Sequence, residues 1–313
     1  MKKILIGLLA LTAWTFVSCD KDDNIIAVER LPLLSVEENI GLFGGKIIYE
    51  HERHGATYPW DWTEEFTQDI KAMWDICRRD VRGWNAQIGV FAVCEELCPE
   101  GEELLSATVE KEMLKKRLKE QGFKKFPAVT RIIRELRDEG LLRYDDFGDD
   151  CIYLSYKNEQ IRKCLIKAGL VLELRVTLAG IEAYDELDDP VYNDVVNGAF
   201  IDWDGSTPNT PETYNTENEI DVLMMHGIVP VFVSCKNGAV GTDELYKLSA
   251  VAAKFGGKYA KKVLVATALS DADPHTKYLR QRAADMGIRL VRNLQDLSDE
   301  DLTETVATFW DIT

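Results

Sequence analysis

The chain has 313 residues, of which 46% are hydrophobic and 29% charged, and its formal net charge is −17. This length and composition exclude a peptide hormone, a disulfide mini-domain and a disordered chain, and are enough for two domains of ordinary size. The negative charge excludes a uniformly basic nucleic-acid coat but not a local basic groove.

The first twenty residues fit two interpretations. Two lysines precede the apolar stretch 4–17, and a serine precedes Cys19, as in a secretory signal with a lipoprotein cysteine. The same residues fit a buried helix over 2–11 and a strand over 12–19, followed by a turn and a second strand over 25–29. The first interpretation predicts a membrane lipoprotein, and the second predicts a cytoplasmic protein. The odd number and irregular spacing of the seven cysteines favour a reducing compartment.

A short helix is predicted over 32–48. Ser35 is its N-cap and Glu38, three residues later, completes a capping box. Gly44 and Gly45 end the helix.

A tryptophan-rich segment follows over 50–90, with helical spacing over 64–81. Tryptophans at such spacing favour an aromatic core or a subunit interface. The acidic stretch 99–103 predicts a loop and a domain boundary.

Residues 107–155 have the element order of a winged helix, which is helix, turn, helix and β-hairpin. The predicted elements are helices over 110–121 and 126–139 and strands over 141–144 and 151–156. Between residues 111 and 143 there are eleven Lys or Arg and five Asp or Glu, so this segment carries +6. Such a basic surface can bind phosphates, but a solvated connector between domains has the same pattern.

The C-terminal half has a one-sided charge and an alternating order of elements. Residues 176–235 contain twelve Asp or Glu and no Lys or Arg, so they need cations from folded neighbours or from a divalent metal. The rest alternates buried strands with helices, which predicts an α/β domain. The strands are predicted over 228–236, 262–268 and 288–291, and the helices over 243–255, 276–286 and 298–309.

The residues that indicate chemistry lie on a predicted β-hairpin over 218–236. A four-residue turn at 226–229 places Asp221 opposite Ser234. Because side chains alternate along a strand, Glu219 shares the face of Asp221.

The other face of this hairpin suits a core and holds Ile220, Val222, Val233 and Cys235. A plain core hairpin has no need of Lys236 beside the carboxylates of the partner strand. Carboxylates and a strand carbonyl bind a hard divalent cation, and a nearby lysine offsets phosphate charge. The cluster therefore predicts phosphodiester hydrolysis, with a surface ion pair between Asp221 and Lys236 as the alternative.

Asp221 and the run Ser234-Cys235-Lys236 resemble the PD-(D/E)XK nuclease motif. Further blocks occur in order at 169–173, 218–222, 232–238, 243–248 and 255–258. Together they resemble the nuclease domain of CRISPR ancillary nucleases, which also contain a CARF domain. Residues 33–45 look like the stretch after the CARF core, so the resemblance covers roughly residues 25–300.

The resemblance implies a role for each matching residue. Glu173, Asp221 and the backbone carbonyl of Cys235 would bind Mn²⁺ or Mg²⁺. Lys236 would be the catalytic lysine.

The chain departs from the motif at Ser234, where the family has Asp or Glu. Glu219 would supply the missing charge and so joins Ser234 among the candidate catalytic residues. Lys247 and Lys258 would contact phosphate.

The resemblance also implies the organisation of the chain and its partners. It implies an α/β fold with a partial Rossmann-like CARF segment and helical insertion in 1–100, a winged-helix-like connector in 101–160 and a restriction-endonuclease-like PD-(D/E)XK domain in 161–313. The implied enzyme is a homodimer that cleaves single-stranded RNA or DNA and is activated by cyclic oligoadenylate in type III CRISPR defence.

Two other interpretations stay open. If the chain contains a CARF domain, only the final helix and strands of that domain would precede residue 30. This arrangement is expected of an N-terminally truncated, cytoplasmic member of the family. We prefer this interpretation to the lipoprotein signal. The alternatives are a catalytically inactive nucleic-acid-binding module and a surface lipoprotein of unknown ligand.

Overall fold

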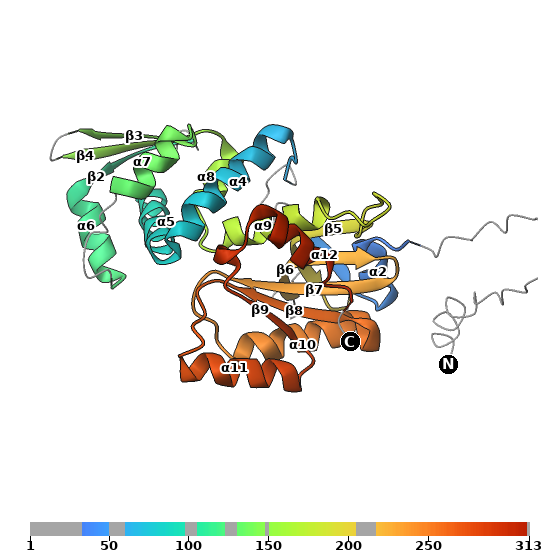
Figure 1. Ribbon diagram of the computed structural model, residues 1–313. Helices are drawn as coiled ribbons and strands as arrows, with labels where there is room; N and C mark the ends of the chain where they lie inside the picture. Colours follow the sequence, from blue (N-terminus) through green and yellow to red (C-terminus); the bar gives the residue numbers. More distant parts are fainter. Residues whose placement is uncertain are drawn as a thin grey trace, which may run out of the picture. The chain divides into compact units, whose positions relative to one another are not determined.

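The computed structural model describes the chain in six stretches (Figure 1). They are residues 33–49, 60–97, 105–122, 130–147, 150–204 and 217–311. The predictions for residues 1–32, including the choice between a lipoprotein signal at Cys19 and a truncated CARF domain, lie outside them, as does the loop 99–103. Within the six stretches no helix is both long and apolar enough to cross a membrane.

A six-stranded mixed sheet confirms the predicted α/β class. Its strands in spatial order are β1 (Lys46–Tyr49), β5 (Asp194–Asp202), β6 (Glu217–His226), β7 (Val229–Lys236), β8 (Lys261–Ala266) and β9 (Arg289–Arg292). Pairing is antiparallel from β1 to β7 and parallel from β7 to β9. Each parallel connection contains a helix, α10 (Asp243–Gly256) or α11 (Pro274–Asp285), as a crossover between parallel strands requires.

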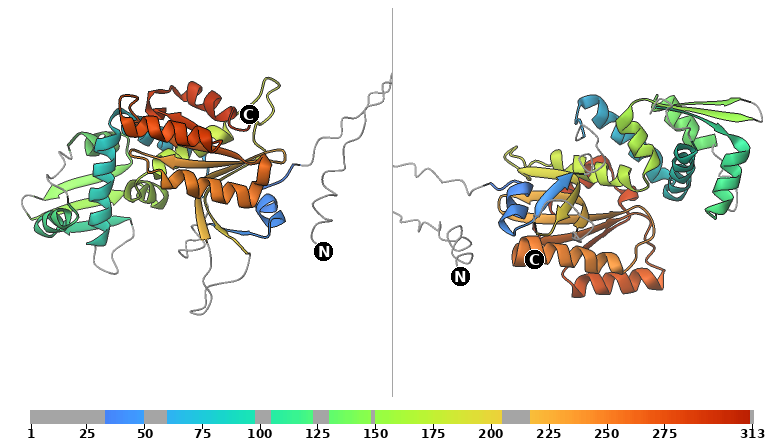
Figure 2. Two further views of the ribbon diagram at one scale, coloured as in Figure 1. Left: turned by 90° about the horizontal axis from the view of Figure 1, so that it is seen from below. Right: turned by 180° about the vertical axis from the view of Figure 1, so that it is seen from behind.

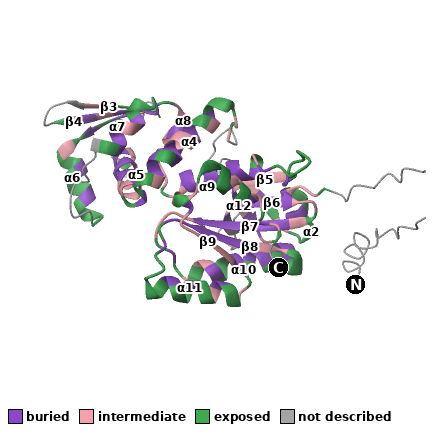
Figure 3. Ribbon diagram, in the orientation of Figure 1, coloured by how far each residue is buried: buried purple, intermediate pink, exposed green. Residues whose placement is uncertain are grey.

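Helices cover both faces of this sheet, and the buried side chains form two clusters (Figures 1 and 3). Helices α9 (Leu170–Ile181) and α12 (Asp299–Ala307) contribute to one cluster, and α10, α11 and α2 (Val36–Leu42) contribute to the other. Val233 of β7 belongs to the first cluster and its neighbour Phe232 to the second. Because both sides of β7 are covered, its sequence is apolar without alternation, as predicted.

The capping box predicted for Ser35 and Glu38 is confirmed at the start of α2. The Glu38 N–H donates to Ser35 Oγ at 3.1 Å, and the Ser35 N–H donates to Glu38 Oε2 at 2.8 Å. The helix ends before Gly44, whose φ of +81° is in the left-handed region that favours glycine. The expectation that this helix reaches residue 48 is wrong, because Lys46–Tyr49 form strand β1 and pair with β5.

The segment between β1 and α9 contains a second, three-stranded sheet and its helices (Figure 2). The strands in spatial order are β2 (Ser106–Glu110), β4 (Cys151–Tyr156) and β3 (Leu142–Phe147). The helices are α4 (Glu64–Arg79), α5 (Val81–Glu96), α6 (Lys111–Glu120), α7 (Thr130–Asp138) and α8 (Glu159–Ile166). The predicted order of helix, helix and hairpin is present as α6, α7, β3 and β4. Strand β2 was not predicted, because five residues directly before a helix give too short a pattern.

The tryptophan-rich segment contributes to a core, as predicted. Trp74 and Trp84 are each 1% exposed. They belong to the cluster that also contains Leu154 of β4, Leu172 of α9 and Val233 of β7. A single apolar cluster therefore joins the helices of 60–97 and the small sheet to one face of the large sheet.

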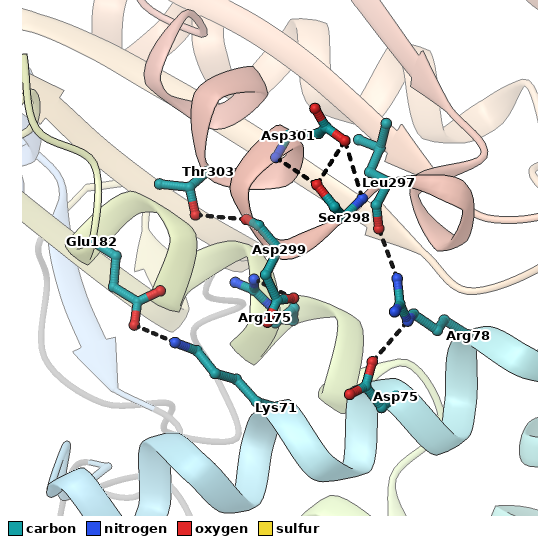
Figure 4. A network of polar contacts seen from close by, with 10 residues as sticks. All are labelled: Lys71, Asp75, Arg78, Arg175, Glu182, Leu297, Ser298, Asp299, Asp301 and Thr303. Atoms are coloured by element: carbon teal, nitrogen blue, oxygen red, sulfur yellow. Dashed lines mark hydrogen bonds and ion pairs between the residues drawn. The ribbon is translucent and has the colours of Figure 1, made fainter.

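Arg175 of α9 is a fully buried cation in a network between α9, α4 and α12 (Figure 4). Its Nη2 lies 2.8 Å from Asp299 Oδ1, and its Nε and Nη1 have no hydrogen-bond partner among the described residues. Burial raises the pKa of Asp299, but the hydrogen bond and charge of Arg175, together with the charges of Lys71 and Arg78, outweigh burial and lower it. Nearby, Lys71 pairs with Glu182 at 2.7 Å.

We expect Asp299→Ala to lower the free energy of unfolding by about 3 kcal/mol, because it leaves the Arg175 charge buried without a partner. Arg175→Met removes the charge together with its desolvation cost, so we expect a change within about 1 kcal/mol. Urea unfolding of both variants measures the difference. Glu300→Ala, on the same exposed turn of α12, is the control. An Asp299→Ala loss no larger than that of Arg175→Met would contradict this account.

Candidate active site

The β6–β7 hairpin has the predicted register but a shorter turn. His226 pairs with Val229, so the turn has two residues, and Gly227 adopts a φ of +61°. The four-residue turn predicted over 226–229 includes the His226–Val229 pair, so the predicted pairing of β6 with β7 is unchanged. Ser234 Oγ lies 3.4 Å from Asp221 Oδ2, which confirms that these two residues are neighbours.

Asp221 lies where β6 departs from regular pairing. The β5–β6 register aligns residues 197 with 222 and 199 with 220 but skips Gly198, whose φ is +65°. The Asn197 side-chain amide donates instead to the Asp221 carbonyl at 3.0 Å. The prediction that Ile220 and Val222 share one core face is wrong, because they belong to different clusters. The irregularity at Gly198 changes which side of the sheet the following residues face.

The Asp221 carboxylate is held by the next strand. The backbone N–H of Cys235 donates to Asp221 Oδ2 at 2.6 Å, and Lys236 Nζ lies 3.6 Å from the same oxygen. The Cys235 side chain is buried in the core, as predicted. The described contacts do not test whether the Cys235 carbonyl binds a metal, so that role stays a prediction.

Glu173 is the second carboxyl of the site and is 6% exposed. It lies in the first turn of α9, which begins after Gly169 in the left-handed region with a φ of +92°. Burial, and next the negative charge of Asp221, raise the pKa of Glu173 to about 8. Its Oε2 atom is buried without a hydrogen-bond partner among the described residues. The helix thus places a carboxyl group, one oxygen of which has no partner in the described part of the chain, within electrostatic reach of Asp221.

Lys236 lies between two carboxylates. Its Nζ is 3.1 Å from Glu244 Oε2 and 3.6 Å from Asp221 Oδ2. Burial alone would lower the pKa of Lys236, but Asp221 and then Glu244 outweigh burial and raise it. Lys236 is therefore an ammonium ion at neutral pH.

Other segments supply cations to the acidic region 176–235, as one of the two predicted explanations requires. Lys167 Nζ lies 3.1 Å from Glu219 Oε1. Glu219, which is predicted to supply the charge missing at Ser234, thus forms an ion pair with Lys167. The charge of Glu219 still acts on both carboxyls of the site and raises the pKa of each.

Sequence reasoning missed the roles of Lys167 and Glu244. Glu244 had a usable signal, because the first turn of a helix that follows a parallel strand lies near the carboxyl end of that strand. Lys167 precedes α9, and no local pattern distinguishes it from other surface lysines.

The two predicted phosphate contacts lie in different places. Lys247 pairs with Glu244 at 3.1 Å, so it lies one ion pair away from Lys236. Lys258 is exposed in the short 3₁₀ turn Gly257–Tyr259, which leads into β8. Strand β8 begins beside Val231, at the opposite end of β7 from Lys236. The structure therefore does not bring Lys258 to the Asp221 cluster.

Amide contacts hold the residue that follows Lys236. Asn237 Nδ2 donates to Asn85 Oδ1 on α5 at 2.9 Å, and Asn237 Oδ1 accepts from Thr267 Oγ1 at 3.0 Å. The Asn85 amide in turn donates to the Asn237 carbonyl at 2.5 Å. The helical segment 60–97 thus fixes the end of β7, a long-range role that its sequence pattern does not indicate.

The donor set fits a divalent cation only in part. Across the described stretches, no three His, Cys, Asp or Glu side chains are close enough to form a metal site by themselves. Glu173 is a buried carboxyl and Asp221 a partly buried one, and Glu173 Oε2 has no hydrogen-bond partner among the described residues. Such oxygens suit Mg²⁺ or Mn²⁺, which are often held by one or two carboxylates together with water and substrate oxygens.

Comparison with known proteins supports the fold. No protein-family model and no curated protein matches the chain. The crystal structure of protein VC1899 from Vibrio cholerae is similar with a TM-score of 0.62 and 16% identity, over 90% of this chain and 63% of that one. The structure of Can2 from Sulfobacillus thermosulfidooxidans in complex with cyclic tetra-adenylate is similar with a TM-score of 0.47 and 12% identity. This similarity covers 89% of this chain and 61% of the Can2 chain. The chain therefore shares the fold of VC1899 and spans less than two thirds of the length of either protein.

Proposed function

We propose that the chain is a metal-dependent nuclease that hydrolyses phosphodiester bonds of single-stranded RNA or DNA. The observation that carries this proposal is the group of Glu173, Asp221 and the Lys236 ammonium at the carboxyl end of β7. A buried and a partly buried carboxyl beside an ammonium cost folding free energy, so they favour a functional role over a structural one.

Glu173 and Asp221 would hold Mn²⁺ or Mg²⁺, with the Cys235 carbonyl as a further predicted ligand. The buried Glu173 Oε2, which has no hydrogen-bond partner within the described stretches, supports this assignment. When bound, such an ion lowers the pKa of water and stabilises negative charge on a phosphate.

The remaining residues orient the site and balance its charge. The Cys235 N–H and the Ser234 hydroxyl hold Asp221 Oδ2, so its carboxylate has a defined direction. The Lys236 ammonium would stabilise the charge that develops on the phosphate oxygens. Because its pKa is raised, Lys236 stabilises charge and does not accept a proton.

The biological setting in this proposal rests on the resemblance of the blocks from 169 to 258 to CRISPR ancillary nucleases. On that basis we extend the proposal to a cytoplasmic homodimer that is activated by a cyclic oligoadenylate.

The test is incubation of labelled single-stranded RNA and DNA with the protein in Mn²⁺, Mg²⁺ or EDTA, with and without cyclic tetra-adenylate. We expect cleavage with either metal, none in EDTA, and faster cleavage with the cyclic nucleotide. Intact substrate under every metal condition, with and without the cyclic nucleotide, would reject the nuclease.

A second candidate is a nucleic-acid-binding module without activity, which Ser234 favours because the motif has an acidic residue there. Its basic segment is partly neutralised, since Arg117 pairs with Glu96 at 3.0 Å and Arg131 with Asp80 at 3.2 Å. Tight binding of the same oligonucleotides without cleavage would favour this candidate over the nuclease.

A further inference from the structure

We propose that Glu244 is a positioning residue for Lys236. This inference rests on the proposed nuclease function and names a residue that the motif does not include.

The geometry singles out Glu244 among the carboxylates near the site. Its Oε2 lies 3.1 Å from Lys236 Nζ, closer than the 3.6 Å between that nitrogen and Asp221 Oδ2. Its other oxygen, Oε1, lies 3.1 Å from Lys247 Nζ, so both oxygens are engaged. The side chains of Glu244 and Lys236 are only 22% and 27% exposed, which limits screening of their attraction by water.

The fold fixes Glu244 in this place. It lies in the first turn of α10, and that helix packs on β7 and β8. Leu245, the next residue, is fully buried in the cluster beneath α10. The carboxylate is therefore presented to Lys236 by a packed helix.

Charge balance explains what Glu244 does. Ser234 is neutral and donates to Asp221, so it offers no negative charge to the Lys236 ammonium. With Asp221 as its one remaining partner in the site, the ammonium would compete with a divalent cation for that carboxylate. Glu244 shares the ammonium with Asp221, so more of the Asp221 charge remains to attract a cation.

The test compares Glu244→Gln with Asp243→Asn. Asp243 is the adjacent acidic residue, is 71% exposed and pairs only with Lys247, at 3.5 Å, in the contacts described. We expect Glu244→Gln to lower kcat by about tenfold or more with little change in KM, because misplacement of a group near the reaction costs turnover. It should also raise the Mn²⁺ concentration needed for half-maximal cleavage. Asp243→Asn should leave all three quantities near wild type, and a Glu244→Gln variant with wild-type kcat and metal requirement overturns the proposal.

A thermal measurement separates this inference from the nuclease proposal. If the wild-type chain does not cleave, the proposed nuclease function fails. The Glu244–Lys236 contact is then tested by the melting temperatures of Glu244→Gln, Lys236→Met and the double variant. We expect the losses from Glu244→Gln and Lys236→Met to be less than additive in the double variant, because both remove one interaction. Additive losses overturn the positioning role whatever the activity.

Discussion

Asp221→Asn and Lys236→Met are expected to reduce cleavage of single-stranded RNA by about a thousandfold and about a hundredfold or more, respectively. Asparagine keeps the shape of Asp221 but removes the charge that would bind a cation. Methionine keeps the length of Lys236 but removes the ammonium that lies 3.6 Å from Asp221. Single-turnover rates in Mn²⁺ measure both effects.

The matched controls are Asp296→Asn and Lys277→Met, which change the same groups at exposed positions. Their rates should stay within about twofold of wild type, as for surface substitutions away from a site. If Asp221→Asn and Lys236→Met cut as fast as these controls, the assignment of the active site is wrong.

Glu173→Gln is expected to abolish metal-dependent cleavage and yet stabilise the metal-free protein. Burial raises the pKa of Glu173 to about 8 from an ordinary value of 4.5. The folded state therefore keeps a proton that the unfolded chain releases in this interval. The stability that the protonated form contributes is present below pH 4.5 and is lost as the pH rises through about 8. Glutamine stays neutral in both states, so the variant should be more stable at pH 7 by roughly 1–3 kcal/mol.

Urea unfolding in EDTA at several values between pH 5 and pH 8 measures this effect. The wild-type free energy of unfolding should fall across that interval, and the slope should be shallower in Glu173→Gln. The exposed Glu300→Gln serves as the control and should keep the wild-type slope. Equal slopes for Glu173→Gln and wild type would show that Glu173 is ionised in the folded protein.

The parts of the site that sequence predicted depend on local rules. Strand alternation and the register of one hairpin are enough to bring Asp221 beside Ser234 and Lys236, and the structure has these contacts. The capping box of Ser35 and Glu38 is equally local. In each case the partners are separated by a short stretch of chain whose geometry allows few alternatives.

The parts that sequence missed depend on partners far along the chain. Residues 46–48 are included in the predicted helical segment but form a strand, because they pair with β5, about 150 residues later in the chain. Ile220 leaves its predicted face because of Gly198 on the neighbouring strand. Asn85 reaches Asn237 across 152 positions. Such contacts follow from tertiary packing, which single-sequence patterns do not contain.

The central claim is that Glu173 and Asp221 jointly hold a divalent cation beside Lys236. Anomalous X-ray diffraction from crystals soaked in Mn²⁺ tests it most directly. The account predicts a manganese peak in contact with oxygens of both carboxylates, and its loss in Asp221→Asn. A saturating soak with no peak at these two residues, or with a peak only elsewhere, would contradict it.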